Sequence, residues 1–305
     1  ILPVIRTLLD KEALFITEQI KRKYRPKTET YIKLAFRPEE QEKLRPIFEQ
    51  LTPAKKQLKL LMAYLELSSF MQRGQFKEVS RNTLLERADV SSSVLSGLID
   101  KGILISYKRE ISRLDTSGRS AEPAHALNTV QQKALDQILH SFKDKEVTLL
   151  HGVTSSGKTE IYIHLIQEVI QKGRQVLYLV PEIALTTQLT TRLQRVFGDS
   201  LAIYHSKFTD NERVEIWNNL LKDKGIRVIL GVRSSIFLPF RDLGLVIVDE
   251  EHENTYKQQD PAPRYHARNA AIVLASMHGA KTLLGSATPA LESYYNAQQG
   301  KYGFV

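Results

Sequence analysis

The 305-residue sequence predicts an α/β fold with a mostly parallel sheet, preceded by a small helical module. From residue 127 onward, short apolar runs alternate with segments that carry apolar residues at helical spacing. A loop rich in glycine and serine joins one such run to a helical segment at 152–159. Short apolar strands separated by helices are typical of a parallel sheet that helices cover on both faces.

The composition is that of an ordinary globular chain, with 42% hydrophobic and 25% charged residues. No stretch approaches the roughly 20 apolar residues of a membrane span, so we expect no membrane partner. The absence of cysteine excludes disulfides and thiolate metal sites within these residues and fits a cytoplasmic protein. The sequence begins at Ile1 without a secretory signal, and we expect it to be a piece of a longer protein.

The net charge of +9 is unevenly distributed. Residues 1–115 hold 22 Lys and Arg against 15 Asp and Glu, whereas the remainder holds 21 against 19. A basic N-terminal part indicates an anionic partner such as nucleic acid. The alternative is a charged surface that serves solubility alone.

Residues 1–51 are expected to be the end of an upstream domain followed by a basic connector. The first nine residues are apolar, and KRKYRPK follows at 21–27. Such a basic run either contacts phosphates or forms a solvated face.

Residues 52–115 predict a winged-helix domain. Its pattern is a helix, a helix–turn–helix and a β-ribbon, at 54–70, 81–88, 92–101 and 103–114. The helix at 92–101 is the candidate recognition helix, with Lys108 and Arg109 at the tip of the wing. The alternative, that the module packs on other protein, stays open.

Residues 116–126 are polar and small and predict a linker. The region 127–305 then forms the α/β domain. Strands are expected at 147–150, 175–180, 200–204, 226–230, 244–248 and 281–285. The helices between them are expected at 128–141, 160–172, 184–197, 210–222 and 266–278.

The loop at 152–159 fits the pattern of a phosphate-binding loop, because Gly152, Gly157, Lys158 and Thr159 stand at the required spacing. Small residues allow backbone N–H groups to close around a polyphosphate at a helix N-terminus. Lys158 is expected to reach the β- and γ-phosphates of ATP, and the Thr159 hydroxyl to hold Mg²⁺. The remaining loop residues expected at the nucleotide are Thr154, Ser155 and Ser156.

A second acidic site follows the apolar run LGLVIV at 243–248. Asp249, at the end of this strand, is expected to hold Mg²⁺ together with Thr159. Glu250 is expected to orient or deprotonate the attacking water. The alternative is an ordinary solvent-facing acidic turn.

Five segments occur in the order of the motifs of superfamily 2 helicases. They are 152–159, LVPEIALTTQ at 179–188, GVRSSIFLPF at 231–240, DEEH at 249–252 and GSATP at 285–289. Together with YKQ after DEEH and RYHARN at 264–269, they resemble the bacterial primosomal replication-restart helicases, the PriA family. The resemblance is strong over 127–305, which would then be a RecA-like P-loop lobe, and weak over 1–115.

The resemblance implies further roles in ATP and DNA binding. Gln131, beside Leu127-Asn128, would read adenine. Strand contacts would come from the segments that contain Pro181, Thr186, Gln188, Arg233 and Ser234. Ser286 and Thr288 would link hydrolysis to movement. Independently of the resemblance, the position of His252 after the acids predicts that it couples the acidic site to a neighbouring element; the alternative is a structural histidine.

The segment 256–268 resembles the aromatic-rich loop of that family. Tyr256, Tyr265 and His266 would stack on bases, and Lys257, Arg264 and Arg268 would contact phosphates. The alternative is a proline-rich polar surface loop.

Two features depart from the family. Ser155 stands where a glycine is usual, which would cost roughly 1–2 kcal/mol if that position requires positive φ. The sequence ends 16 residues after Pro289. The second motor lobe, its arginine fingers and the zinc-binding cysteine segment are therefore expected outside it.

We therefore expect an ATP-dependent DNA helicase or translocase that restarts replication at stalled or recombined forks and loads the primosome. Its partners would be forked or single-stranded DNA, other primosome proteins and single-strand-binding protein, at the nucleoid in the cytoplasm. Two alternatives stay open. One is another superfamily 2 repair or recombination translocase, and the other is a non-catalytic fork-binding module whose conformation the nucleotide sets.

Overall fold

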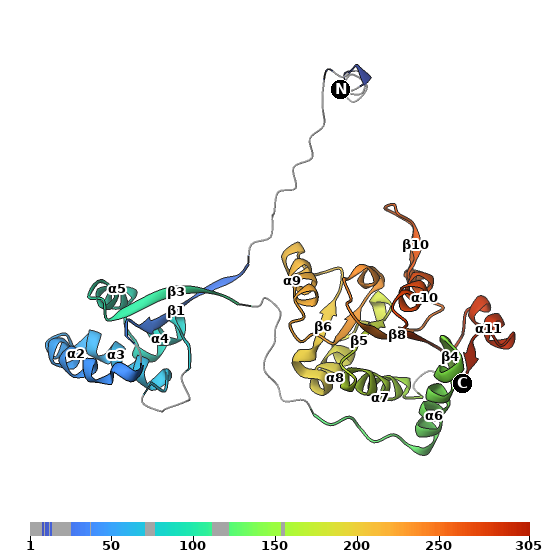
Figure 1. Ribbon diagram of the computed structural model, residues 1–305, viewed down its shortest axis with the longest axis horizontal. Helices are drawn as coiled ribbons and strands as arrows, with labels where there is room; N and C mark the ends of the chain where they lie inside the picture. Colours follow the sequence, from blue (N-terminus) through green and yellow to red (C-terminus); the bar gives the residue numbers. More distant parts are fainter. Residues whose placement is uncertain are drawn as a thin grey trace.

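The structure, a computed structural model, describes residues 8, 10–11, 13, 26–36, 38–70, 77–111, 122–153 and 156–305 (Figure 1). Thr154, Ser155, most of the basic run 21–27 and most of the expected linker lie outside the described residues. Within the described part, no helix is both long and apolar enough to span a bilayer.

The first body is a winged helix with a three-stranded sheet in the order β2-β1-β3. Its elements are β1 (Thr28–Leu34), a 3-10 helix (Pro38–Lys43), α2 (Leu44–Leu51), α3 (Lys55–Leu67), β2 (Val79–Ser80), α4 (Arg81–Ala88), α5 (Ser92–Asp100) and β3 (Leu104–Glu110). Ser80 caps α4 by accepting a hydrogen bond from the backbone N–H of Thr83, as an N-cap serine is expected to do. The three helices expected in this region are present.

Two features of this body differ from the sequence expectation. β1 lies before residue 52, yet it pairs along its whole length with β3, and its Ile32 lies in the same core as Leu61 of α3. The unit therefore begins near Thr28, because the partner of the ribbon strand comes from before the helices. Lys108 and Arg109 are not at a turn: they pair with Thr30 and Glu29 inside the β1–β3 ladder.

The second body is a seven-stranded sheet in the order β12-β4-β11-β8-β5-β7-β6, and all its pairings are parallel. Its strands are β4 (Val147–His151), β5 (Gln175–Leu179), β6 (Leu201–Tyr204), β7 (Val228–Gly231), β8 (Leu243–Asp249), β11 (Lys281–Ser286) and β12 (Gly303–Phe304). The six strands expected from apolar runs are present. The short edge strand β12 was not expected.

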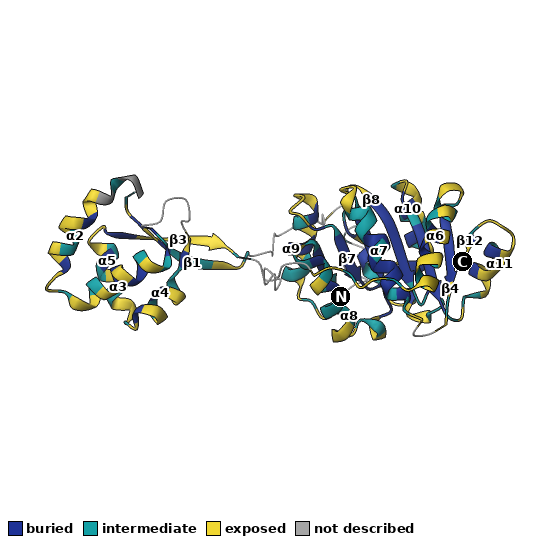
Figure 2. Cartoon of the chain, turned by 90° about the horizontal axis from the view of Figure 1, so that it is seen from below, coloured by how far each residue is buried: buried dark blue, intermediate teal, exposed yellow. Residues whose placement is uncertain are grey.

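Helices cover both faces of this sheet, and its strands are the most buried part of the body (Figure 2). One core joins the sheet to α6 (Thr129–Asp144), α7 (Lys158–Gln171) and α8 (Thr187–Phe197). The opposite core joins it to α9 (Asp210–Leu221), α10 (Ala267–Met277) and α11 (Leu291–Gln298). The α/β class with a RecA-like, mostly parallel sheet is thereby confirmed.

The direction of the strands determines at which edge of the sheet a ligand can bind. Because all the pairings are parallel, the loops after β4, β5, β6, β7, β8 and β11 leave the same edge of the sheet. Ligands of open parallel sheets bind outside this carboxyl edge. A small hairpin of β9 (Lys257–Gln258) and β10 (Tyr265–His266) projects beyond it (Figure 1).

Candidate functional site

The glycine loop after β4 leads directly into α7. Gly157 is the N-cap of α7 and adopts φ +81°, a conformation that favours glycine. The Lys158 side chain is 8% exposed, and its ammonium donates to the carbonyl oxygens of Gly152 and Val153, at 2.8 and 3.3 Å. The ammonium is thus held at the helix N-terminus, where anions bind.

Gln131, the residue that the resemblance assigns to adenine, lies against this loop. Its amide nitrogen donates to the carbonyl oxygen of Gly157 at 3.4 Å, and a Cβ at position 157 would meet that nitrogen at 2.3 Å. Its carbonyl oxygen accepts from the N–H of Asn128, which completes a capping box at the start of α6. Gln131 therefore also has a structural role that the sequence analysis did not assign.

Asp249 ends β8, and two buried tyrosines hold its carboxylate. The hydroxyl of Tyr162, from α7, donates to Oδ1 at 3.1 Å, and that of Tyr178, from β5, donates to Oδ2 at 3.2 Å. Burial and the neighbouring Glu250 carboxylate raise the pKa of Asp249, whereas the two hydroxyls and Lys158 oppose that rise. Burial, reinforced by Asp249, raises the pKa of both tyrosines well above the ordinary value, so both act as donors.

The other two acids of DEEH have different environments. Glu250 is partly exposed and has φ +46°, a left-handed conformation that is unusual for glutamate. Glu251 is fully buried and accepts from Arg268 Nη1 and Ser293 Oγ at 2.8 Å each and from the N–H of Ala290 at 2.6 Å. The alternative of a solvent-facing acidic turn is therefore wrong, because burial and partners separate the acids.

The residues expected to couple hydrolysis to movement lie together. His252 Nδ1 is 2.8 Å from the Ser286 hydroxyl, and its Nε2 is 3.3 Å from that of Thr288. The Ser286 hydroxyl also accepts from the N–H of Thr288 at 3.1 Å. The Glu250 carboxylate is 3.8 Å from His252 Nδ1, so the imidazole lies between the acid and the GSATP loop.

These groups fit Mg²⁺ and a polyphosphate. Tyr178 donates to Asp249, and the neighbouring Thr159 side chain lowers the pKa of Tyr178 against the larger rise that burial causes, so the two expected Mg²⁺ ligands share one neighbour. Within the described residues no group of three His, Cys, Asp or Glu side chains could form a metal cage. Magnesium usually needs only one or two protein ligands, because phosphates and water supply the rest.

The residues expected at DNA lie along the same carboxyl edge. A cleft of about 210 Å³ is lined by Pro181, Arg233 and Ser234, and Tyr256 forms part of its wall. Thr186 and Gln188 are exposed at the start of α8, where the Thr186 hydroxyl accepts from the N–H of Leu189. Pro181 itself is largely buried, so it shapes the cleft more than it offers a surface.

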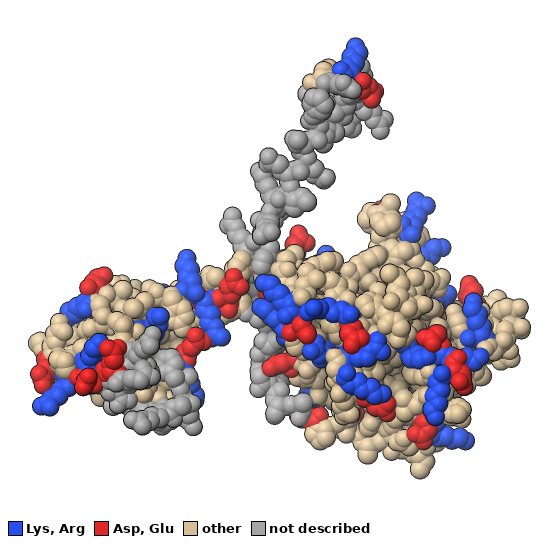
Figure 3. All heavy atoms as spheres, viewed as in Figure 1, with Lys and Arg blue, Asp and Glu red and all other residues tan. Residues whose placement is uncertain are grey.

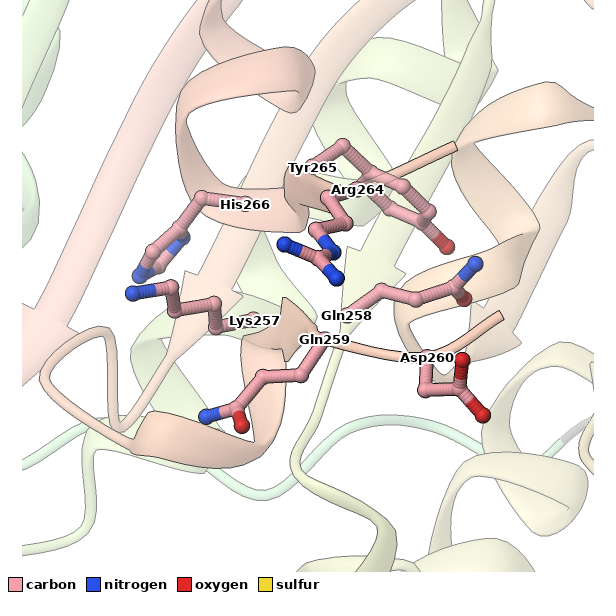
Figure 4. Close-up of a pocket in the computed structure, with 7 residues that line it drawn as sticks. All are labelled: Lys257, Gln258, Gln259, Asp260, Arg264, Tyr265 and His266. Atoms are coloured by element: carbon pink, nitrogen blue, oxygen red, sulfur yellow. The ribbon is translucent and has the colours of Figure 1, made fainter. Parts of the chain in front are cut away.

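The hairpin β9–β10 encloses a second, more open hollow of about 700 Å³ (Figure 4). Lys257 and His266 lie side by side at one end, and the Arg264 guanidinium points between the two strands. Tyr265 lies at the other end, and its ring packs edge-on against Phe237 with centroids 5.0 Å apart. Figure 3 shows lysine and arginine atoms on this projecting part.

Two residues of the predicted aromatic-rich loop do not lie at its surface. Tyr256 is 1% exposed, and its hydroxyl donates to the backbone oxygen of Asp249 at 2.6 Å, so its ring offers no face for a base. Arg268 is 7% exposed and is paired with Glu251. Both expectations are wrong because the two ends of the loop pack onto the DEEH segment.

Some residues that shape the site were not identified from the sequence. Arg213 lines the 210 Å³ cleft, and its Nη2 donates to the carbonyl oxygen of Ser206 in the loop after β6. Tyr162 and Tyr178 stand in apolar patterns that fit core positions equally well. The only signal was a hydroxyl-bearing ring among the aliphatic residues of the buried positions of α7 and β5.

Comparison with known proteins places both bodies in described families. Residues 29–111 match the family model described as a winged helix domain of PriA helicase from Bacteroidota, and residues 128–297 match that of DEAD/DEAH box helicases. The winged helix begins at nearly the same residue as β1, in agreement with the strand pairing.

Two curated relatives with the same name match most of the chain. The chain is 43% identical over 224 residues to the replication restart protein PriA of Bacillus subtilis, which covers 72% of this chain and 28% of the relative. It is 40% identical over 247 residues to that of Haemophilus influenzae, covering 78% of this chain and 33% of the relative. The chain thus spans about a third or less of these relatives.

The resemblance to the PriA family is confirmed by the winged-helix match and by these relatives. The helicase match covers more than half of the 305 residues and contains the glycine loop, the DEEH segment and GSATP. The chain belongs to the DEAD/DEAH box helicase family.

Proposed function

We propose that residues 1–305 form the winged helix and first motor lobe of an ATP-dependent DNA helicase that restarts replication at stalled or recombined forks and loads the primosome. The observation that supports it most is the shared carboxyl edge of the sheet: Lys158 and Asp249 lie at the same edge as the cleft that contains Arg233 and Ser234, and Tyr256 of that cleft contacts Asp249. The relatives support the replication role through their name.

In this proposal, the lobe binds ATP through the backbone N–H groups at the start of α7 and the Lys158 ammonium. Gly152, Ser156 and Gly157 belong to the described part of that loop, Gln131 of α6 lies against it, and Thr154 and Ser155 belong to it by sequence. Thr159 and Asp249 hold Mg²⁺, which neutralises charge on the phosphates. Lys158 exchanges its bonds to carbonyl oxygens for bonds to phosphate oxygens.

Glu250 orients and deprotonates the water that attacks the γ-phosphorus, and the bond from phosphorus to the ADP oxygen breaks. Its partial exposure and its left-handed backbone support this role, since strained backbone concentrates at functional sites. His252 passes the change of charge at Glu250 to Ser286 and Thr288. The resemblance assigns the completing arginine to a second lobe.

Single-stranded or forked DNA would lie along the cleft, in contact with Thr186, Gln188, Arg233 and Ser234. The hairpin residues Lys257, Arg264 and Tyr265 would hold it by phosphate contact and stacking. Other primosome proteins, single-strand-binding protein and a nucleoid location belong to the same proposal. Zinc is proposed only for residues outside this sequence.

A DNA-stimulated ATPase assay tests this function. The longer protein should hydrolyse ATP faster when forked DNA is added, and residues 1–305 alone should be at least about 10³-fold slower, the typical contribution of an arginine finger. Equal hydrolysis with and without DNA by the longer protein would overturn the motor function. Robust DNA-stimulated turnover by residues 1–305 would instead show that an arginine of this chain completes the site.

A further inference from the structure

Three tyrosine hydroxyls donate hydrogen bonds to Asp249. Asp249 ends β8, a strand whose other side chains are aliphatic. Tyr162 and Tyr178 are 0% exposed and donate to the carboxylate, while Tyr256 donates to the backbone oxygen. The rings of Tyr162 and Tyr178 pack edge-on, with centroids 5.5 Å apart. The Tyr162–Tyr178 pair, which we term the tyrosine clamp, is therefore a rigid unit formed by α7 and β5.

The clamp leaves one acceptor position of the carboxylate open. A carboxylate has about four lone-pair positions, two on each oxygen. Oδ1 accepts from the Tyr162 hydroxyl and from the N–H of Glu250, both at 3.1 Å. Oδ2 accepts from Tyr178 alone among the described residues. The remaining lone pair on Oδ2 is the one available to a metal or to its bound water.

Tyr178 also joins the two expected Mg²⁺ ligands. Its hydroxyl donates to Oδ2 of Asp249, and the neighbouring Thr159 side chain lowers its pKa against the larger rise that burial causes. The side chain thus spans the space between α7 and the end of β8.

Gly285 makes room for the clamp. A Cβ at this position of β11 would lie 1.9 Å from the Tyr162 hydroxyl oxygen, 3.0 Å from Cζ and 3.5 Å from Asp249 Oδ1. Contacts below 3.0 Å do not occur, so a side chain here would displace the hydroxyl from Asp249. The glycine of GSATP is therefore required by the Tyr162 hydroxyl, which occupies the space that a side chain at position 285 would fill.

We propose that Tyr162 and Tyr178 are positioning residues that hold Asp249 so that only Oδ2 meets Mg²⁺, with Gly285 as the space that permits it. The inference rests on the proposed nucleotide site. Hydrogen-bonded neighbours of metal ligands fix the orientation of those ligands, and their loss weakens metal binding. The clamp acts on the metal, not on the nucleotide bases or on DNA.

Binding of Mn²⁺ to residues 1–305 in the presence of ADP tests the proposal, with free Mn²⁺ measured by electron paramagnetic resonance. Tyr162→Phe and Tyr178→Phe should each weaken Mn²⁺ binding by about tenfold or more, the usual scale for such neighbours. The matched control is Tyr64→Phe, because Tyr64 is equally buried, in the winged-helix core, and should leave Mn²⁺ binding unchanged. ADP affinity measured in EDTA should be the same in all four proteins.

Gly285→Ala provides an independent arm. Alone it should weaken Mn²⁺ binding about as much as Tyr162→Phe, and in the Tyr162→Phe background it should add little, because the 1.9 Å contact is gone. If the clamp only stabilised the fold, each variant would have a lower melting temperature. The effects of Gly285→Ala and Tyr162→Phe on Mn²⁺ binding would then add in the double variant, contrary to the proposal.

A measurement on the wild-type chain needs no variant. With ¹³Cζ-labelled tyrosine, Mg²⁺ added to the ADP-bound chain should shift at least two resonances. If the wild type binds ADP in a metal-dependent way, either of two results would overturn the proposal. One is that no tyrosine resonance shifts when Mg²⁺ is added. The other is that both clamp variants bind Mn²⁺ as tightly as Tyr64→Phe does. A wild-type chain without metal-dependent ADP binding would overturn it together with the proposed function.

Discussion

Arg268 Nη1 lies 2.8 Å from Oε2 of Glu251, and both side chains are buried. The pair joins the start of α10, where the hairpin β9–β10 ends, to the residue that follows Glu250. At the other end of the hairpin, Tyr256 donates to the backbone oxygen of Asp249. The segment expected to contact DNA is therefore attached at both ends to the acidic segment expected to act on ATP.

The first prediction concerns this ion pair. Arg268→Ala should destabilise the helicase domain by about 3–5 kcal/mol, because it leaves the Glu251 carboxylate buried without its cation. The measurement is denaturant unfolding. Arg264→Ala, in the exposed part of the hairpin, is the matched control and should change stability little. Lower DNA affinity of Arg268→Ala at unchanged stability would instead support the contact that the sequence suggested.

The second prediction separates the two acids of the site. Asp249→Asn should weaken Mg²⁺-dependent nucleotide binding about tenfold or more, since a charged partner of the metal becomes neutral. Glu250→Gln should bind Mg²⁺-nucleotide nearly as well as wild type and lose roughly 10²–10⁴-fold in turnover, the range for a general base. Calorimetry on residues 1–305 and turnover by the longer protein measure the two effects. If both variants hydrolysed ATP at the wild-type rate, the assignment of Asp249 and Glu250 to the active site would be wrong.

The third prediction concerns the hairpin surface. Lys257→Ala and Arg264→Ala should each weaken single-stranded DNA binding and reduce the slope of log affinity against log salt by about 0.7, the value for one phosphate contact on a single strand. Titrations with a labelled oligonucleotide at several salt concentrations measure both effects. Arg87→Ala in the winged helix, whose side chain pairs with Glu66, is the control within the same chain. An unchanged slope in both hairpin variants would mean that these cations do not touch phosphate.

The sequence predicted the central strands because each is an apolar run bounded by polar or small residues, and it predicted the glycine loop from a spacing that only a few folds use. β12 has two residues and carries no period. β1 was not assigned to the winged helix because the residues of its partner, β3, lie 70 to 82 positions away in sequence. Strand pairing over such distances leaves no local pattern.

The sequence predicted the site residues in the loops at the strand ends, but not the buried residues that pack against those loops. Lys158, Thr159 and Asp249 follow known spacings at strand ends. The burial of Tyr256 and Arg268 depends on how the ends of a loop pack, which composition does not encode. Tyr162 and Tyr178 have the spacing of core residues, and only the three-dimensional approach of α7, β5 and β8 shows that their hydroxyls meet one carboxylate.

The central claim is that the loop at 152–159 binds a Mg²⁺-nucleotide through the Lys158 ammonium. Isothermal titration of residues 1–305 with a non-hydrolysable ATP analogue, with and without Mg²⁺, tests it most directly. The matched control is Lys172→Ala, at the exposed end of the same helix. Wild type and Lys172→Ala should bind the analogue alike and more tightly with Mg²⁺, whereas Lys158→Ala should show no measurable binding. Equal affinity of Lys158→Ala and wild type would contradict the assignment of this loop to the nucleotide.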